Sequence, residues 1–315
     1  MLLGRVKIWI LAVTFVFLAV LPLLTAVFDE PFYLTLASRI MIFAIAAISL
    51  DLILGFGGMV SLGHAAYLGV GAYAAGILSF HGIDSGWIQL PAAIGGSALV
   101  ALIIGAICLR TSGVYFIMIT LAMTQLLFFL GISLETYGGD DGLPTSRSQF
   151  VDAVDLNNDA NLYYLIFGFM VASLFFSWRL VHSHFGMVIR GAKDNETRMA
   201  AIGFPTFRYK LLAFTLAGAM CGVAGFLLAN LTQFVTPDFM HWFRSGEIMV
   251  MVLVGGMGSL FGAAFGAAAF LLFEEFVSGL TPHWMVIFGP LLVVLVLFAK
   301  QGLWGLIPSA ARRDG

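Results

Sequence analysis

The chain has 315 residues, of which 61 % are hydrophobic and only 10 % are charged, and it contains 30 phenylalanines. Soluble domains usually carry about a quarter charged residues, so this composition excludes an ordinary soluble domain. The net charge of −2 tells less than the positions of the charges do. We therefore expect an all-α polytopic membrane protein, with one transmembrane domain over residues 1–315 and no nucleic-acid partner.

The two cysteines give no sign of a cross-link or a metal site. Cys108 and Cys221 both lie inside apolar runs, without a second cysteine or a histidine at ligand spacing. We expect two buried small hydrophobic side chains, with no disulfide, no metal and no cofactor bound to this chain.

Hydrophobic runs of about 20 residues are long enough, at ~1.5 Å per residue, to cross a ~30 Å hydrocarbon core. The first run follows Arg5 and Lys7 and is too long for a signal-peptide apolar region of roughly 7 to 15 residues, so we expect an uncleaved first span. Eight full spans are predicted, at 8–28, 36–55, 59–80, 88–108, 114–134, 162–181, 211–231 and 284–299.

The basic residues predict the orientation, because Lys and Arg near span ends tend to stay in the cytoplasm. With the N-terminus inside, the loop at 182–210 and the C-terminus are cytoplasmic, and the acidic loop at 135–161 faces the outside. Most of the 15 basic residues then share the cytoplasmic side: Arg5, Lys7, Arg110, Arg179, Arg190, Lys193, Arg198, Arg208, Lys210, Lys300, Arg312 and Arg313.

Residues 246–277 do not fit this scheme as two full spans, because the segment is too short. They must cross twice or not at all, and a broken or re-entrant helix pair is predicted, with the break at Gly255, Gly256 and Gly258. Non-helical backbone at membrane depth is tolerated only where it is buried in protein or lines a cavity.

Residues 57–67 and 255–265 share Gly, Gly, Met, Ser, Leu, Ala and Ala in register. One interpretation is an internal repeat, by which many transporters place broken helices around a site near the bilayer midplane. The other is that glycine-rich membrane helices resemble one another through shared packing needs. On the first interpretation the translocation pathway is lined by Asp51, Gly57, Gly58, Ser61, His64, Gly255, Gly256 and Ser259.

Two polar residues near this segment have two interpretations each. Asp51 either lines a cavity or fixes a helix, or it caps the cytoplasmic end of its span, since an unpaired carboxylate in the membrane is costly. His64 either contacts substrate or, as membrane histidines commonly do, hydrogen-bonds within the protein.

The 182–210 loop has helical character of its own. Phe185, Val188, Ile189 and Ala192 recur at helical spacing, and Gly203 ends the pattern. The segment either lies on anionic lipid or contacts a protein. Its ordered mixture of acidic, basic and small residues favours protein contact, because a lipid-binding patch would be uniformly basic.

Several motifs now point to a family. The runs 183–204 and 208–214, Ser-Leu-Gly-His-Ala-Ala at 61–66, Tyr-Gly-Gly-Asp-Asp-Gly-Leu at 137–143, Gly-Gly-Met-Gly-Ser-Leu-Phe-Gly at 255–262 and Gly-Leu-Trp-Gly at 302–305 follow one another in the chain. Together they resemble the inner-membrane permease subunits of branched-chain amino acid ABC importers, the LivM type, over about residues 36–307. Asp51 departs from this pattern, since many members have Asn there.

The resemblance implies a role and a set of partners. The chain would move branched-chain amino acids across the bacterial inner membrane beside a LivH-like second permease. Two ABC ATPase subunits would supply ATP hydrolysis, and a periplasmic amino-acid-binding protein would deliver substrate. The ATPases would contact the cytoplasmic loop at Phe185, Gly186, Arg190, Asp194, Asn195, Glu196, Arg198, Ala200 and Gly203.

Three other functions are weighed against this one. An intramembrane enzyme is disfavoured because no HExxH or GxSxG motif occurs, so no catalytic residue is assigned, and no phosphate-binding Gly-x-x-x-x-Gly-Lys motif occurs either. A stand-alone secondary transporter would use Asp51 as a proton site but leaves the cytoplasmic helix unexplained. A related importer of urea or short amides remains an alternative substrate class.

Overall fold

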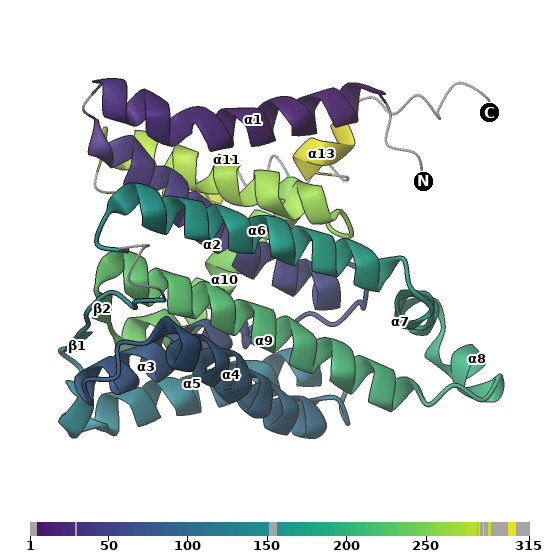
Figure 1. Cartoon of the computed structure of the whole chain (residues 1–315). Helices are drawn as coiled ribbons and strands as arrows, with labels where there is room; N and C mark the ends of the chain where they lie inside the picture. Colours follow the sequence, from purple (N-terminus) through teal and green to yellow (C-terminus); the bar gives the residue numbers. More distant parts are fainter. Residues whose placement is uncertain are drawn as a thin grey trace.

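The computed structural model describes residues 5–28, 30–150, 156–281, 283, 286, 289–290 and 302–306. Within these ranges the chain is almost wholly helical, as predicted (Figure 1). Apart from Val286, Gly289 and Pro290, the predicted span at 284–299 lies outside the described set, as do the predicted cytoplasmic residues Lys300, Arg312 and Arg313. The longer helices are α1 (Arg5–Phe28), α2 (Pro31–Leu54), α3 (His64–Phe80), α4 (Gly86–Cys108), α5 (Val114–Ser133), α6 (Asp159–Val181), α9 (Thr206–Thr232), α10 (Trp242–Gly255) and α11 (Leu260–Ser278).

Seven described helices are long and apolar enough to cross a membrane: α1, α2, α4, α5, α6, α9 and α11. The predicted third span, 59–80, is corrected, because α3 begins only at His64 and has 17 residues. The residues before it, from Gly55 to Gly63, are non-helical. Gly58 has φ +68°, a conformation that glycine adopts without steric cost and that ends a right-handed helix.

Other predicted spans, among them those of α2, α6 and α9, start later than their helices do, because polar residues at their ends were assigned to loops. Helix α2 begins at Pro31, a residue suited to the first helical turn. Helix α6 begins at Asp159, where the Asn158 side chain accepts a hydrogen bond from the Ala160 nitrogen at 3.0 Å. Helix α9 begins at Thr206, so its first turn includes part of the predicted 182–210 loop.

Helix α2 is the centre of the bundle. Every residue from Met41 to Leu54 is buried, which marks a helix surrounded by protein on all sides. It packs on α6, α9 and α11, while α1 lies on the outside of the bundle (Figure 1).

Helix α9 packs closely on α3 and α4 through glycines. An added Cβ at Gly225 would collide with the Leu68 carbonyl oxygen of α3, and one at Gly222 would collide with Ser97 of α4. Gly218 faces Ala101 of α4 in the same way. Gly218 and Gly222, spaced four apart, thus let the backbones of α9 and α4 approach closely.

The two ends of the bundle differ. At one end, β1 (Leu143–Pro144) pairs antiparallel with β2 (Phe234–Val235), and the short helices η1 (Glu135–Tyr137) and η2 (Pro237–Met240) lie next to them in the chain. We call this the β end. At the other end lie α7 (His184–Asp194), α8 (Glu196–Ala201) and α13 (Gly302–Leu306) (Figure 1). We call this the α7 end.

The predicted 135–161 loop is partly ordered structure. Gly138, Gly139 and Gly142 all have positive φ, so the Tyr-Gly-Gly-Asp-Asp-Gly-Leu motif forms a tight turn that leads into β1. Further along, Ser148 donates its backbone N–H to Asn230 of α9 at 2.7 Å. The loop is thereby fixed to the bundle, and Asp140 and Asp141 are left exposed.

Candidate functional site

Two helix breaks stand at the centre of the candidate site. The first separates α2 from α3 at residues 55–63, and the second separates α10 from α11 at residues 256–259. Gly58 and Gly256 occupy the same position in the two similar sequences, and both have positive φ, +68° and +111°. Ser61 and Ser259 each accept a hydrogen bond from a following backbone nitrogen, of Gly63 and Gly262 respectively. The similarity at 57–67 and 255–265 thus extends to the local backbone.

The predicted break at Gly255, Gly256 and Gly258 is confirmed, but the predicted bounds of the helix pair, 246–277, are corrected. Helix α10 starts at Trp242 and has 14 residues, whereas α11 has 19 and is by itself long enough to span. The two helices pack on each other through small residues, since an added Cβ at Gly266 would collide with the Met251 carbonyl oxygen.

The two breaks meet through Asp51. Its Oδ1 accepts a hydrogen bond from the backbone nitrogen of Gly258 at 2.7 Å. An added Cβ at Gly55 would collide with Asp51 Oδ1 and with the Gly258 nitrogen, so glycine is required for this approach. The carboxylate therefore lies just before the first turn of α11, where the N–H groups and the helix dipole favour an anion.

His64 opens α3 and is fully buried. Its Nε2 lies 2.7 Å from Ser49 Oγ of α2, and its carbonyl oxygen accepts from the Cys221 thiol of α9. The next residue, Ala65, donates its N–H to Ser245 Oγ of α10 at 2.9 Å. These bonds hold the start of α3 among three other helices.

The predicted pathway residues are brought together at these breaks, but most have no exposed surface in this chain. Asp51, Gly57, Ser61, His64, Gly255 and Gly256 are buried, Ser259 is half-buried and Gly58 is exposed. In the described structure the side chains of Asp51, Ser61 and His64 bond to backbone or side-chain groups of the same chain. Whether they line a pathway stays a hypothesis.

The 182–210 loop forms two helices where one was expected. Asn195 adopts an extended backbone with φ −161°, ends α7 and caps α8 by accepting from the Arg198 nitrogen at 2.8 Å. Asn is a preferred N-cap residue, because its side chain can accept a hydrogen bond from the backbone N–H three residues later. The sequence analysis missed this N-cap signal.

Helix α7 lies against the bundle. Val188, Ile189 and Ala192 are buried, as their spacing predicted. Gly186 is also buried. It lies so close to the end of α6 that an added Cβ would collide with the Val181 carbonyl oxygen. Arg190, on the exposed side, donates to that same oxygen at 3.1 Å.

Lys193 connects α7 to the first break. Its ammonium donates to the Gly55 carbonyl oxygen, one residue past the end of α2, at 2.7 Å. Its methylene groups lie over Gly58, where an added Cβ would come within 2.9 Å of Lys193 Cγ. A cation at the carboxyl end of a helix is favoured by the free carbonyls and by the helix dipole.

Helix α8 extends from the bundle (Figure 1). Glu196, Arg198 and Ala200 are exposed, as are Asp194, Asn195 and Gly203 beside the helix, while Phe185 on α7 is half-buried. Glu196 forms an ion pair with Lys210 of α9. Ile202, which follows α8, has 65 % of its surface exposed. This combination of exposed charge and exposed apolar surface suits contact with another protein.

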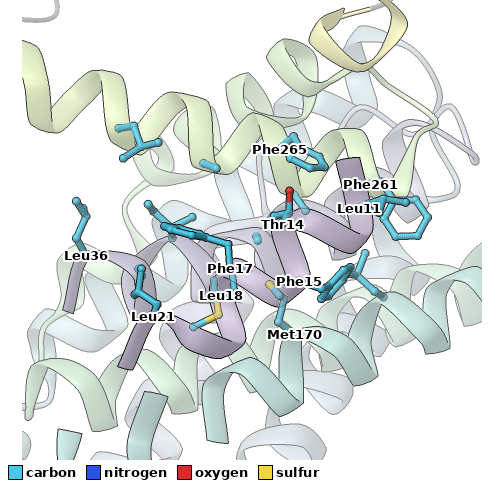
Figure 2. A pocket seen from close by; sticks show the side chains of 18 of the residues that line it. Leu11, Thr14, Phe15, Phe17, Leu18, Leu21, Leu36, Met170, Phe261 and Phe265 are labelled. Atoms are coloured by element: carbon cyan, nitrogen blue, oxygen red, sulfur yellow. The ribbon is translucent and has the colours of Figure 1, made fainter. Parts of the chain in front are cut away.

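A second feature is an apolar groove of about 520 Å³ between α1, α2, α6 and α11 (Figure 2). Among the labelled side chains only Thr14 carries an oxygen, and its hydroxyl donates to the Ile10 carbonyl within α1. Tyr33 is the other lining residue in the described groove with a side-chain oxygen, and no charged side chain lines it. The lining residues include Leu11, Phe15, Phe17, Leu18, Leu21, Ile40, Met170, Phe261 and Phe265.

Within the described ranges, no three His, Cys, Asp or Glu side chains come close enough to hold a metal ion. Cys108 and Cys221 are both free and buried. The polar groups of the site are thus one carboxylate, one ammonium, the His64 ring, several serine hydroxyls and the backbone groups of two helix breaks.

Comparison with known proteins supports a transport role for this architecture. Residues 32–297 match the family described as branched-chain amino acid transport system, permease component. The chain is 28 % identical to the high-affinity branched-chain amino acid transport system permease protein LivM of Salmonella typhimurium, over 85 % of this chain and 69 % of that protein. It is 24 % identical to the permease protein LivH of Escherichia coli K12, over 84 % and 91 % respectively.

A further relative is the autoinducer 2 import system permease protein LsrC of Salmonella paratyphi B, 26 % identical over 60 % of this chain and 48 % of that protein. No solved structure matches the chain significantly. The family match covers most of the helical bundle, both helix breaks and the α7–α8 segment. The chain therefore belongs to the family of permease components of branched-chain amino acid transport systems.

Proposed function

We propose that this multi-pass permease is one of two translocating subunits of an ABC importer that carries branched-chain amino acids across the bacterial inner membrane. A LivH-like chain is the second permease, two ATPase subunits bind at the α7 end, and a periplasmic binding protein delivers substrate at the β end. On this proposal the α7 end, with both termini, is cytoplasmic. ATP is bound and hydrolysed by the partners.

The observation that carries the proposal is the α7–α8 segment. Helix α8 is exposed apart from the half-buried Met199, while α7 next to it is fixed into the bundle by buried residues and by Lys193. A segment with one half exposed and the other half anchored can transmit a partner's movement to the membrane helices.

The β end suits the opposite role. Asp140 and Asp141 lie exposed on a turn that three positive-φ glycines and the β1–β2 pair hold in place. A rigid acidic turn offers a partner a fixed surface with little ordering cost.

The experiment that tests the proposal is purification of the complex after mild solubilisation of the native membrane, followed by mass spectrometry. We expect two ATPase subunits and a second permease to accompany the chain. A chain that carries Arg198→Glu with Ala200→Arg on exposed α8 should insert normally and lose the ATPases only. Recovery of the unaltered chain alone, competent for gradient-driven uptake, would support a secondary transporter instead.

A further inference from the structure

The end of α2 and the start of α11 meet. Next to each lies a polar group from another helix, of the sign that the helix dipole favours. The Lys193 ammonium donates to the Gly55 carbonyl at the carboxyl end of α2, and the Asp51 carboxylate accepts from the Gly258 nitrogen at the amino end of α11. We propose that Lys193 and Asp51 are positioning residues that transmit movement of α7 to the break between α10 and α11.

This inference rests on the proposed function, because it names the route by which an ATPase bound at α8 would act on the membrane helices. The route has three contacts in series, from Lys193 to Gly55, along the last turn of α2 to Asp51, and from Asp51 to Gly258. A contiguous series of charge-assisted hydrogen bonds and one rigid helical turn is a physical means of coupling two sites.

The receiving end of the route contains two glycines with positive φ. Gly256 and Gly258 have φ of +111° and +77°, so the break is made of residues that change backbone conformation at low cost. Met257 between them has 56 % of its surface exposed. Helix α13 closes the break from the other side, since an added Cβ at Gly302 would collide with Gly256.

Lys193 donates to the carbonyl oxygen of Gly55, four residues after Asp51, whereas Arg39 and Arg244 form ion pairs with Glu274 and Glu247. Asp51 Oδ2 has no hydrogen-bond partner among the described residues. The Gly258 N–H thus holds the Asp51 side chain, and a shift of Lys193 with α7 reaches it through Gly55 and the last turn of α2.

The test uses the whole complex in proteoliposomes, with Met257→Cys as a reporter, since the native Cys108 and Cys221 are buried. Maleimide labelling of the new cysteine is measured with and without a non-hydrolysable ATP analogue, and amino acid uptake per ATP hydrolysed is measured in parallel. In the parent we expect the analogue to change the labelling rate about twofold or more, within the range of reported coupling effects.

Lys193→Met keeps the methylene contact with Gly58 but removes the ammonium, and Asp51→Ala removes the acceptor. Both should lose the labelling response and lower uptake per ATP roughly 2- to 30-fold, with ATPase binding retained. Asp51→Asn should restore both readouts because its amide oxygen accepts from Gly258, and it keeps the test valid if Asp51→Ala misfolds. Arg110→Met, which removes a cation from the same end of the bundle, is the matched control and should behave as the parent.

The outcomes separate the two proposals. If Lys193→Met and Asp51→Ala keep the parent's labelling response and uptake per ATP, the relay is wrong and the importer stands. If the parent binds no ATPase and shows no response to the analogue, the importer proposal and the relay fall together.

Discussion

Ser49 Oγ and His64 Nε2 lie 2.7 Å apart, so a buried hydrogen bond joins the helices on either side of the first break. Both side chains have no exposed surface. Across the nine non-helical residues that separate α2 from α3, this bond fixes where α3 begins. This bond agrees with the structural interpretation of His64, and contact with substrate stays a hypothesis.

Replacing His64 by alanine should destabilise the protein. The change leaves Ser49 without its ring partner and opens a cavity at a fully buried position, which typically costs about 2–5 kcal/mol. The measurement is thermal or denaturant unfolding in detergent. His81→Ala, at an exposed position near the β end, is the control and should change stability little. Equal stability of the two variants would show that the bond does not hold the break.

The glycine contacts of α9 give a second test. Gly225→Ala should cost about 1–3 kcal/mol, because the added methyl group collides with backbone of α3 that cannot rotate away. Gly168→Ala on α6 is the matched change, since nothing lies within 4 Å of its added Cβ. It should be neutral or stabilise by up to about 1 kcal/mol through helix propensity. The prediction is wrong if both variants unfold at the same temperature.

Glu196 tests the contact with the ATPases. Glu196→Lys should leave membrane insertion and stability unchanged, because an exposed ion pair contributes only about 0–1 kcal/mol, and should lower uptake per ATP hydrolysed.

The combined change Glu196→Lys with Lys210→Glu restores the pair within the chain in reversed order. If this double variant couples as poorly as Glu196→Lys alone, Glu196 acts through a partner. Full recovery of coupling by the double variant would mean that Glu196 acts only through its ion pair with Lys210.

Ser259 tests the pathway hypothesis better than Ser61 does. Ser61 is fully buried, so a bulky residue there would disturb folding first. Ser259 is half-buried and caps α11 by accepting from the Gly262 nitrogen at 3.2 Å. Ser259→Leu should reduce uptake while the complex still assembles, and Ser259→Asp, which keeps a capping oxygen, controls for the lost cap. Normal uptake by Ser259→Leu would show that the break between α10 and α11 does not line the pathway.

The sequence predicts the helices well where a long apolar run ends in charged residues or glycine, as at 88–108 and 114–134, which match α4 and α5 within two residues. It predicts the second break because three glycines interrupt an apolar segment that is too short for two spans. It places the start of α3 too early, since apolarity continues through Met59 and Val60 although the backbone there is not helical.

The contacts that define the candidate site lie beyond such reasoning. Asp51 and Gly258 are 207 positions apart, and Lys193 and Gly55 are 138 apart. Nothing in the local pattern of either residue indicates its partner. The apolar groove was also missed, because a leucine that faces a groove and one that faces a neighbouring helix look the same in a membrane sequence.

The central claim, that this permease works in an importer driven by ATP, is tested most directly by uptake into proteoliposomes that contain the whole complex and its binding protein. We predict that labelled leucine accumulates only with ATP on the side of the ATPases, and that valine and isoleucine compete whereas urea does not. Leucine accumulation driven by a proton gradient without ATP, or competition by urea and not by valine, would contradict the claim.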